Sequence, residues 1–394
     1  MKLSKWCTEL KKNYLFQIIN EKTKKFKYEH PDLKLINMGI GDVSLPLSHS
    51  IVNACKLASQ EMGNIETFRG YGPSGGYEFL KKSIQSDYSS RNISIDLDEI
   101  FISDGAKSDM SNILDIFSSD NTCIIPDPVY PVYLDTSIMK NTVIKFANCT
   151  EENDFLPLPD MSVKADIIYI CSPNNPTGAS YSKSQLKQWV DYANYCDAII
   201  LYDAAYESFI QDDSCRSIFE VEGADLCSIE FKSFSKSAGF TGMRCGYSIV
   251  SKKLKRQNIS INSVWSRRHS TKFNGVPYII QRAAEASLSP EGKKECKKLL
   301  EYYKKNTRLV SDLLNKHSIK FFGGTNSPYV WMKCPGNMKS WEFFDYMLEN
   351  FQIIGTPGSG FGENGENYFR LSCFGLHENV LEACKRLESI NKNT

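Results

Sequence analysis

The segment 233-SFSKSAGFTGMRCGY-247 holds one lysine, two serines and one arginine at spacings that can serve a single site. A protonated lysine amine is a poor nucleophile, but burial lowers its pKa, and the neutral amine can then bond to a carbonyl carbon. Lys236 follows an apolar run typical of a buried strand. Ser233 and Ser235 carry hydroxyl groups and Arg244 carries a planar guanidinium. The segment therefore predicts a cradle for a dianionic phosphate beside a reactive amine.

Four more polar segments follow apolar runs of the chain. They are 104-DGAKSD-109, 127-DPVYPVY-133, 172-SPNNPTG-178 and 203-DAAY-206. The preceding runs are apolar throughout, as expected for strands that are covered on both faces. Because ligands of open α/β sheets bind beyond the carboxyl ends of the strands, we expect these segments and 233–236 to lie on one rim.

The side chains on this predicted rim match the groups of pyridoxal 5′-phosphate (PLP). Asp203 would hold a protonated ring nitrogen, while Tyr206 and Asn175 would bond to the phenolic oxygen. Tyr130 would stack on the ring, and Ala106, at the expected start of a helix, would offer a backbone N–H to the phosphate. The rim therefore predicts a PLP site.

Each of these residues alone has a more ordinary interpretation. A lone Lys236 would be a surface charge, Asp203 alone a helix N-cap, and Tyr206 alone a core tyrosine. The hypothesis of a PLP site therefore depends on the rim that these residues share.

The segment 70-GYGPSG-75 matches the dinucleotide-binding pattern G-x-G-x-x-G, but 64-NIETFR-69 before it is a poor strand and no acidic residue follows at the expected distance. A nicotinamide site is therefore not expected.

Short apolar runs alternate with helix-length segments over most of the chain. Strands are expected at 34–38, 99–103, 122–126, 142–147, 166–171, 197–202, 226–231 and 246–250, and helices at 75–89, 105–118 and 183–195. This alternation predicts an α/β fold with a mostly parallel sheet.

The pattern changes after about residue 275. A long helical region at 277–316 is followed by short strands at 328–332 and 368–372 and a closing helix at 378–390. Such a segment is typical of a smaller α+β unit. We expect two domains: a large domain over 46–284, and a small one that combines 1–45 with 285–394.

The composition narrows the classes of function. The 394 residues include 47 Lys and Arg and 46 Asp and Glu, a net charge of +1 that indicates no nucleic-acid partner. The 13 cysteines form no Cys-x-x-Cys pair, which favours free thiols and a cytoplasmic location. The five histidines lack metal-ligand spacing, so no metal is expected. No apolar run approaches the roughly 18 residues of a membrane span, and no signal peptide is visible.

In type and order, the motifs resemble those of the fold-type-I, class I/II PLP aminotransferases, over nearly the whole chain. The motifs that carry this resemblance are 171-CSPNNPTGA-179, 203-DAAY-206, 234-FSKSAGFTG-242 and 369-FRLS-372. Within that family, further segments are similar to the branch that acts on LL-diaminopimelate, among them 13-NYLF-16, 69-RGYGP-73, 273-FNG-275 and 327-SPYVW-331. The resemblance implies a large domain with a mostly parallel seven-stranded sheet sandwiched by helices, a smaller α+β domain, and a homodimer.

The resemblance also implies roles for individual residues. Lys236 would bond to the cofactor aldehyde and later carry the proton of the substrate α-carbon, with Asp203 and Tyr206 as its catalytic companions. The implied cofactor-binding residues are Ala106, Lys107, Tyr130, Asn175, Asp203, Tyr206, Ser233, Ser235, Lys236, Arg244 and Tyr71. The implied substrate-binding residues are Tyr14, Gly41, Tyr71, Lys107, Tyr130, Asn175, Asn274 and Arg370.

Two further expectations concern the far end of the substrate and the dimer. Tyr71 and Asn274 would reach across a dimer interface into the other protomer's site. Glu66, five residues before Tyr71, is a hypothetical acceptor, supplied by the neighbouring subunit, for the distal ammonium group of a substrate with two amino-acid heads.

Several functions fit these residues. The leading hypothesis is amino transfer between LL-2,6-diaminopimelate and 2-oxoglutarate, giving tetrahydrodipicolinate and glutamate, for lysine and peptidoglycan precursor synthesis. An aminotransferase for aspartate, alanine or aromatic amino acids, or a PLP-dependent C–S lyase, would use the same Lys236 and Asp203. A cofactor-dependent transcription regulator would need an added DNA-binding domain, for which residues 1–45 are too few.

Overall fold

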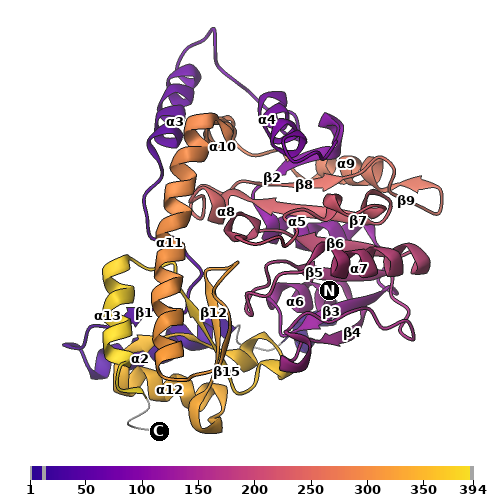
Figure 1. The fold of residues 1–394 in the computed structure, drawn as a ribbon. Helices are drawn as coiled ribbons and strands as arrows, with labels where there is room; N and C mark the ends of the chain where they lie inside the picture. The colour runs from indigo at the N-terminus through magenta and orange to yellow at the C-terminus, as the bar shows by residue number, and fades with distance from the viewer. Residues whose placement is uncertain (1, 11–14, 391–394) are drawn as a thin grey trace.

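The computed structural model describes residues 2–10 and 15–390, and its largest element is a seven-stranded sheet (Figure 1). In spatial order the strands are β2 (Ile100–Ser103), β8 (Gly246–Val250), β7 (Ser228–Ser233), β6 (Ile199–Asp203), β5 (Ile167–Cys171), β3 (Thr122–Asp127) and β4 (Val143–Asn148). Neighbouring strands are parallel except at β8, which runs antiparallel to both β2 and β7. The predicted mostly parallel seven-stranded sheet is confirmed.

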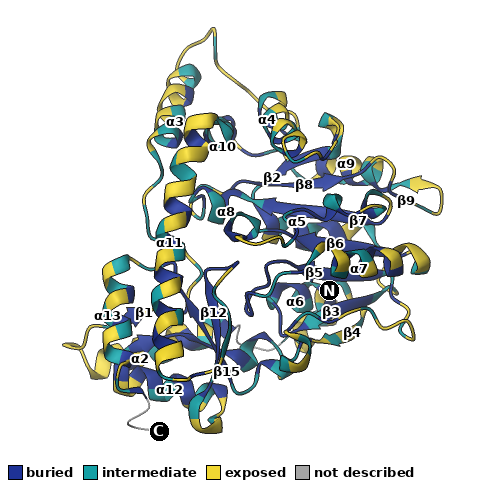
Figure 2. Ribbon diagram, viewed as in Figure 1, coloured by how far each residue is buried: buried dark blue, intermediate teal, exposed yellow. Residues whose placement is uncertain are grey.

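The central strands form because their side chains are apolar on both faces. Every residue of β5 (IIYIC) and β6 (IILYD) is buried, and the strands are dark blue in Figure 2. Tyr169 and Leu201 point into one core, while Ile170 and Tyr202 point into the core on the opposite face. Burial of each such side chain contributes about 1.5–3 kcal/mol. The strand ends that carry the polar segments are therefore anchored in packed core.

Helices cover both faces of this sheet. The helices of this part of the chain are α3 (His49–Met62), α4 (Glu78–Ser89), α5 (Ala106–Asn112), α6 (Val132–Lys140), α7 (Lys183–Cys196), α8 (Phe234–Ser237), α9 (Ile261–Lys272) and α10 (Tyr278–Leu288). Side chains of α5, α6 and α9 pack into the core on one face, and those of α7 into the core on the other. The two faces together give the sandwich that the sequence indicates.

Local signals explain where these helices begin and end. The Ser182 hydroxyl accepts from the Gln185 N–H at 3.3 Å to start α7, and Asp197 ends it in the left-handed region at φ 58°. The helix expected at 75–89 begins only at Glu78, because Gly76 at φ 97° cannot be helical. The helix expected at 105–118 tightens into a 3-10 helix (Ile113–Ile116) instead of continuing.

A second, antiparallel sheet of four strands is built from the C-terminal part of the chain. Its order is β11 (Phe321–Gly323), β12 (Tyr329–Lys333), β15 (Tyr368–Ser372) and β14 (Thr356–Pro357). Beside it, the short strand β1 (Ile36–Asn37) pairs in parallel with β13 (Ile353–Ile354). The helices around this sheet are α2 (Leu15–Glu29), α12 (Ser340–Phe351) and α13 (His377–Leu387). Two small elements remain: α1 (Trp6–Glu9) lies near the N-terminus, and the hairpin of β9 (Lys255–Arg256) and β10 (Ile259–Ser260) lies on the side of the large sheet. The N-terminal residues thus join the C-terminal segment, while the domain boundaries stay a prediction.

A long helix, α11 (Pro290–Lys316), runs from the large sheet to the small one (Figure 1). The continuous helical region expected at 277–316 is wrong at one point, because the chain breaks between α10 and α11. Ser289 leaves the helical conformation and accepts from the Gly292 N–H at 3.1 Å, and Pro290 takes the first helical position, where no N–H is needed. Both α10 and α11 can therefore pack independently.

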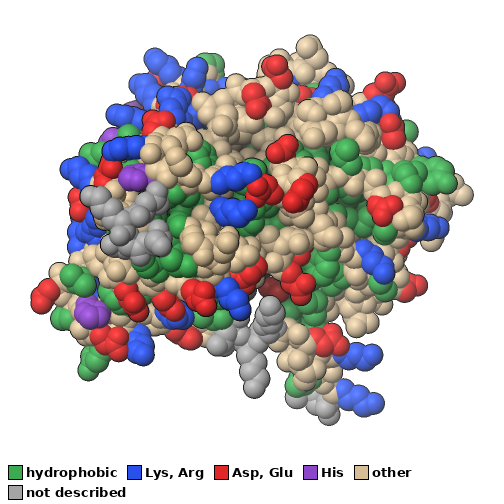
Figure 3. Space-filling view, turned by 60° about the horizontal axis from the view of Figure 1, so that its bottom comes forward, with side chains coloured by type: hydrophobic (Ala, Val, Ile, Leu, Met, Phe, Trp, Pro, Cys, Tyr) green, Lys and Arg blue, Asp and Glu red, His purple; other side chains and the backbone are tan. Residues whose placement is uncertain are grey.

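On the face in Figure 3, acidic and basic side chains are interspersed over much of the surface, while basic side chains gather at the upper left. Within residues 2–10 and 15–390, no helix is long and apolar enough to cross a membrane.

Candidate active site

A cavity of about 450 Å³ lies beyond the carboxyl ends of the parallel strands, where the two sheets approach each other. It brings together twelve of the residues that the sequence singled out: Gly41, Ala106, Lys107, Tyr130, Asn175, Asp203, Tyr206, Ser233, Ser235, Lys236, Arg244 and Arg370. The polar segments after β2, β3, β5, β6 and β7 therefore share one rim.

Lys236 lies in the short helix α8, directly after β7. The Ser233 hydroxyl starts that helix by accepting from the Ser235 N–H at 3.1 Å. The Lys236 amine donates to the backbone oxygen of Gly41. Burial lowers the pKa of this amine to about 8. The positive charges of Arg370 and Arg244 also lower it, and the negative charge of Asp42 raises it. Lys236 is thus not an ordinary surface lysine, and a large share of its amine is neutral near pH 8.

Asp203 is the last residue of β6 and its carboxylate is buried. One oxygen accepts from the Ala205 N–H at 2.9 Å, and the other accepts from the Tyr133 hydroxyl at 2.5 Å. Burial raises the pKa of Asp203, while these two donors lower it. A buried carboxylate of this kind is stabilised by a cation, such as a protonated ring nitrogen, in the adjoining cavity.

A concave group of donors surrounds the start of α5. Arg244 donates from Nη1 to the Ser235 hydroxyl at 3.1 Å and to the Thr241 carbonyl at 3.3 Å. Gly105, at φ 134°, allows the close approach, since a Cβ there would lie 2.6 Å from Nη2 of Arg244. A guanidinium, two serine hydroxyls and the Ala106 N–H fit a dianionic phosphate.

Arg370 lies in β15 and its side chain is almost fully buried, with a relative exposure of 1%. Its Nη1 donates to Oδ1 of Asn175 at 2.6 Å, and its Nη2 donates to the Gly39 carbonyl at 2.5 Å. The guanidinium carbon lies 4.4 Å from the ring centroid of Tyr329 and 4.8 Å from that of Phe361. These contacts hold a planar fork at the cavity, as recognition of a carboxylate requires.

Asn175 and Tyr206 have neighbours that fix which atoms they can offer. Oδ1 of Asn175 is engaged by Arg370, so its amide NH₂ is the donor available to a ligand oxygen. The Tyr206 hydroxyl lies 2.8 Å from that of Tyr329, and burial raises the pKa of Tyr206 well above its ordinary value. Tyr206 therefore stays a neutral hydroxyl.

Sequence reasoning missed several residues of this cavity: Phe16, Ile40, Asp42, Tyr133, Cys171, Ala205, Thr241 and Tyr329. Tyr133 had a usable signal, because it follows Tyr130 by three residues at a helix start and so lies one turn away on the same side. For Tyr329 and Phe361, no local signal predicted the contact with Arg370, because antiparallel strand pairing and a loop bring them there.

Four candidates do not line the cavity or are not described. Tyr71, Glu66 and Asn274 are exposed, and Tyr14 lies outside the described residues. The loop between α3 and α4 carries the first two and projects from the top of the molecule in Figure 1. Gly70–Gly75 in this loop is preceded by turns and not by a strand, so the context of a dinucleotide site is absent there, as expected.

The chain belongs to the class I and II aminotransferases, whose family pattern it matches over residues 34–387. An LL-diaminopimelate aminotransferase of Lachnospira eligens is 47% identical, covering 96% of this chain and 97% of its own. A protein of the same name from Methanosphaera stadtmanae is 46% identical, with 99% of both chains covered. The solved L,L-diaminopimelate aminotransferase of Chlamydomonas reinhardtii superposes with a TM-score of 0.93 at 38% identity, over 99% of this chain and 98% of that one.

This family uses PLP, so the chain is a PLP-dependent transaminase. The residues present fit that cofactor: the glycine at 105 leaves room for Arg244 beside the serine hydroxyls, the buried Asp203 suits a ring cation, and Lys236 is near a neutral state. The glycine-rich loop 355–365 packs Phe361 against Arg370, which lines the same cavity.

Proposed function

We propose that the enzyme transfers an amino group between LL-2,6-diaminopimelate and 2-oxoglutarate, with tetrahydrodipicolinate and glutamate on the other side of the reaction. The observation that carries this proposal is end-to-end similarity, at 46–47% identity, to proteins named for that activity. Such a reaction belongs to the synthesis of lysine and peptidoglycan precursors.

The geometry supports a division of labour in the cavity. PLP, when bound, supplies an electron sink for the substrate α-carbon. Lys236 carries the proton at that carbon, because burial lowers the pKa of its amine to about 8, where it both accepts and returns a proton. Asp203 keeps a ring nitrogen protonated, since its carboxylate is fixed by two donors. Arg370 holds the α-carboxylate with a fork that its neighbours pre-orient.

The remaining assigned residues fall into two groups around the cofactor. Asn175 and Tyr206 hold the phenolic oxygen and Tyr130 stacks on the ring, while Ser233, Ser235, Arg244 and the backbone of Ala106 and Lys107 hold the phosphate. Gly41, whose carbonyl accepts from the Lys236 amine, lines the substrate side.

The enzyme works as a homodimer with shared sites. The loop between α3 and α4 presents large apolar side chains to solvent, with Ile65 95% and Tyr71 94% exposed. Such exposure is unusual in a monomer and typical of an interface. In the dimer, Tyr71 and Asn274 enter the neighbouring site, and Glu66 accepts the distal ammonium group of the substrate.

Glu66 gives this dimer proposal a substrate-specific test. The Glu66→Gln variant loses the negative charge and keeps the shape, so kcat/KM should fall more for LL-diaminopimelate than for glutamate. Equal losses on both substrates would contradict the role of Glu66.

A cytoplasmic location and the two-domain division complete the proposal. None of the 13 cysteines forms a disulfide, which supports a reducing compartment. The large domain covers 46–284, and the small one joins 1–45 to 285–394, as the pairing of β1 with β13 supports.

Steady-state kinetics test the proposed substrate. With 2-oxoglutarate as acceptor, kcat/KM should be largest for LL-diaminopimelate and small for meso-diaminopimelate, aspartate, alanine and tyrosine. Preference for aspartate or tyrosine would make the enzyme a general aminotransferase with the same mechanism.

A further inference from the structure

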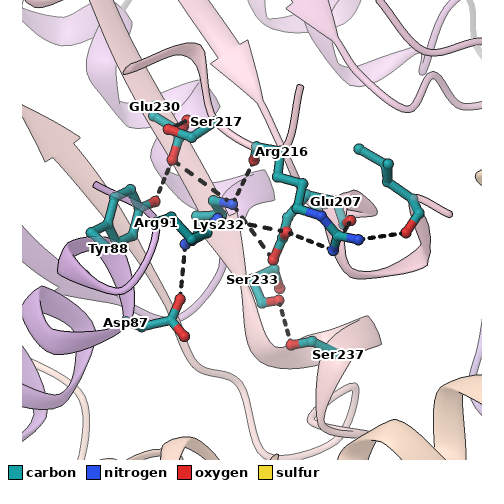
Figure 4. Close-up of polar contacts among 12 residues, drawn as sticks. Asp87, Tyr88, Arg91, Glu207, Arg216, Ser217, Glu230, Lys232, Ser233 and Ser237 are labelled. Atoms are coloured by element: carbon teal, nitrogen blue, oxygen red, sulfur yellow. Dashed lines mark hydrogen bonds and ion pairs between the residues drawn. The ribbon is translucent and has the colours of Figure 1, made fainter. Parts of the chain in front are cut away.

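A cluster of charged side chains lies behind the active-site cavity, on β7 and its neighbours (Figure 4). Side chains alternate along β7, so Phe231 enters the core on one face while Glu230 and Lys232 point to the other. The Glu230 side chain has no exposure and that of Lys232 only 5%. Charges this deeply buried occur when they are paired and hydrogen-bonded.

Glu230 has its partners within the cluster. Its carboxylate accepts from the Tyr88 hydroxyl, from the Ser217 hydroxyl at 2.7 Å and from the Ile218 N–H at 2.8 Å. Three donors satisfy the oxygens of this carboxylate without help from Lys232, whose amine lies 3.9 Å away. Lys232 is therefore available for other contacts.

Those contacts tie together two segments of the active site. The Lys232 amine donates to the Arg216 carbonyl at 2.9 Å and lies 3.6 Å from Oε1 of Glu207. Lys232 directly precedes Ser233, and Glu207 directly follows Tyr206. One ion pair thus joins the segment that carries Asp203 and Tyr206 to the segment that carries Ser233 and Lys236.

A cavity lies behind these two segments as well as in front of them. A second cavity, of about 200 Å³, lies on their other side, lined among others by Ala205, Ser233, Lys232 and Glu207. Ala205 and Ser233 also line the active-site cavity, so the backbone at both positions passes between two cavities. The Ala204 N–H donates to the Phe231 carbonyl at 2.9 Å and joins the two strand ends, and beyond this bond polar side-chain contacts help to set the position of the backbone.

We propose that Lys232 is a positioning residue for the cofactor, because its ion pair with Glu207 sets the separation of the two segments that grip PLP. The inference deepens the proposed function and rests on its cofactor chemistry, not on its substrate. PLP contacts both segments at once, so an error in their separation weakens binding and changes the surroundings of Lys236.

Cofactor binding to the apo-protein, measured without any substrate, tests this role. Lys232→Met removes the charge at nearly constant length, and we expect the dissociation constant of PLP to rise about tenfold or more, because the half-buried Glu207 loses the nearest of its three cationic neighbours. The pH at which the absorption band of the bound cofactor titrates should also shift. Lys293→Met is the matched control: Lys293 lines the same small cavity, but its amine pairs with Asp87 at 2.6 Å. It should leave both quantities unchanged.

Two further variants separate positioning from general stability. Lys232→Arg keeps the charge and should retain tight PLP binding, whereas Glu207→Gln should weaken binding as Lys232→Met does. The double variant should bind PLP no more weakly than the worse single variant, since both substitutions remove the same contact.

A wild-type dissociation constant and pH titration in Lys232→Met, or a lowered melting temperature with unchanged PLP binding, would overturn the proposal. If Lys232→Met does not fold, unchanged PLP binding by Glu207→Gln overturns it instead. A wrong substrate assignment would not alter any of these results, because no substrate is present.

Discussion

Replacement of Arg370 by lysine tests the carboxylate site with the smallest possible change. Lysine keeps the positive charge but loses the fork that now bonds to Asn175 and Gly39 at once. A single ammonium group cannot keep these contacts and also hold both oxygens of a carboxylate. Arg370→Lys therefore removes at least one charge-assisted hydrogen bond to the substrate.

The expected loss follows from the strength of that bond. A hydrogen bond to a charged group contributes about 1.5–3 kcal/mol, and each 1.4 kcal/mol is about tenfold in a dissociation constant. Binding of the amino acid should weaken by about 10- to 150-fold. The affinity for PLP should fall less than the affinity for the amino acid, because Arg370 is assigned to the substrate carboxylate and meets the cofactor-binding set through Asn175, to which its Nη1 donates.

Two titrations of purified protein measure these quantities, one with PLP and one with the amino acid added to PLP-loaded enzyme. Arg282→Lys is the matched control, since Arg282 also stacks on an aromatic ring, 3.8 Å from Phe79, but lies in α10 and does not line the cavity. Unchanged amino-acid affinity in Arg370→Lys, or equal losses of affinity for PLP and substrate, would refute the assignment of the fork.

Three further predictions concern the cofactor. In the apo-protein the pKa of Lys236 is lowered to about 8, so the rate of PLP capture should rise with pH up to about 8 and then level off; a rate that rises up to the ordinary value of 10.5 would contradict its burial. Asp203→Asn loses the charge that holds the ring nitrogen, and kcat should fall by about 10²–10³, with wild-type turnover as the contrary result. Gly105→Ala should weaken PLP binding, because its Cβ would lie 2.6 Å from a nitrogen of Arg244 at φ 134°, whereas Gly242→Ala, with nothing within 4 Å, should bind PLP normally.

Most of the large sheet could be predicted because its signals are local. Runs such as 166–171 are apolar throughout, and parallel strands buried on both faces require that pattern. The polar residues at their ends, including Asp203 and Lys236, follow directly from strand positions, since every parallel strand ends at the same rim.

The parts that could not be predicted depend on contacts between distant segments. Tyr329 meets Tyr206 only because β12 is placed beside β15, and nothing near residue 329 records that pairing. The break at Ser289 was visible as a serine followed by proline, but the amphipathic pattern continues across it, so periodicity alone missed it. The roles of Tyr71, Glu66 and Asn274 depend on a second chain and stay predictions.

The measurement that tests the central claim most directly is a single-turnover absorption titration of PLP-loaded enzyme. LL-diaminopimelate and glutamate should each convert the bound cofactor to its amine form, while meso-diaminopimelate, aspartate and tyrosine should leave the spectrum unchanged. Conversion by aspartate or tyrosine but not by LL-diaminopimelate would contradict the proposed function, and no cofactor band at all would contradict the role of Lys236.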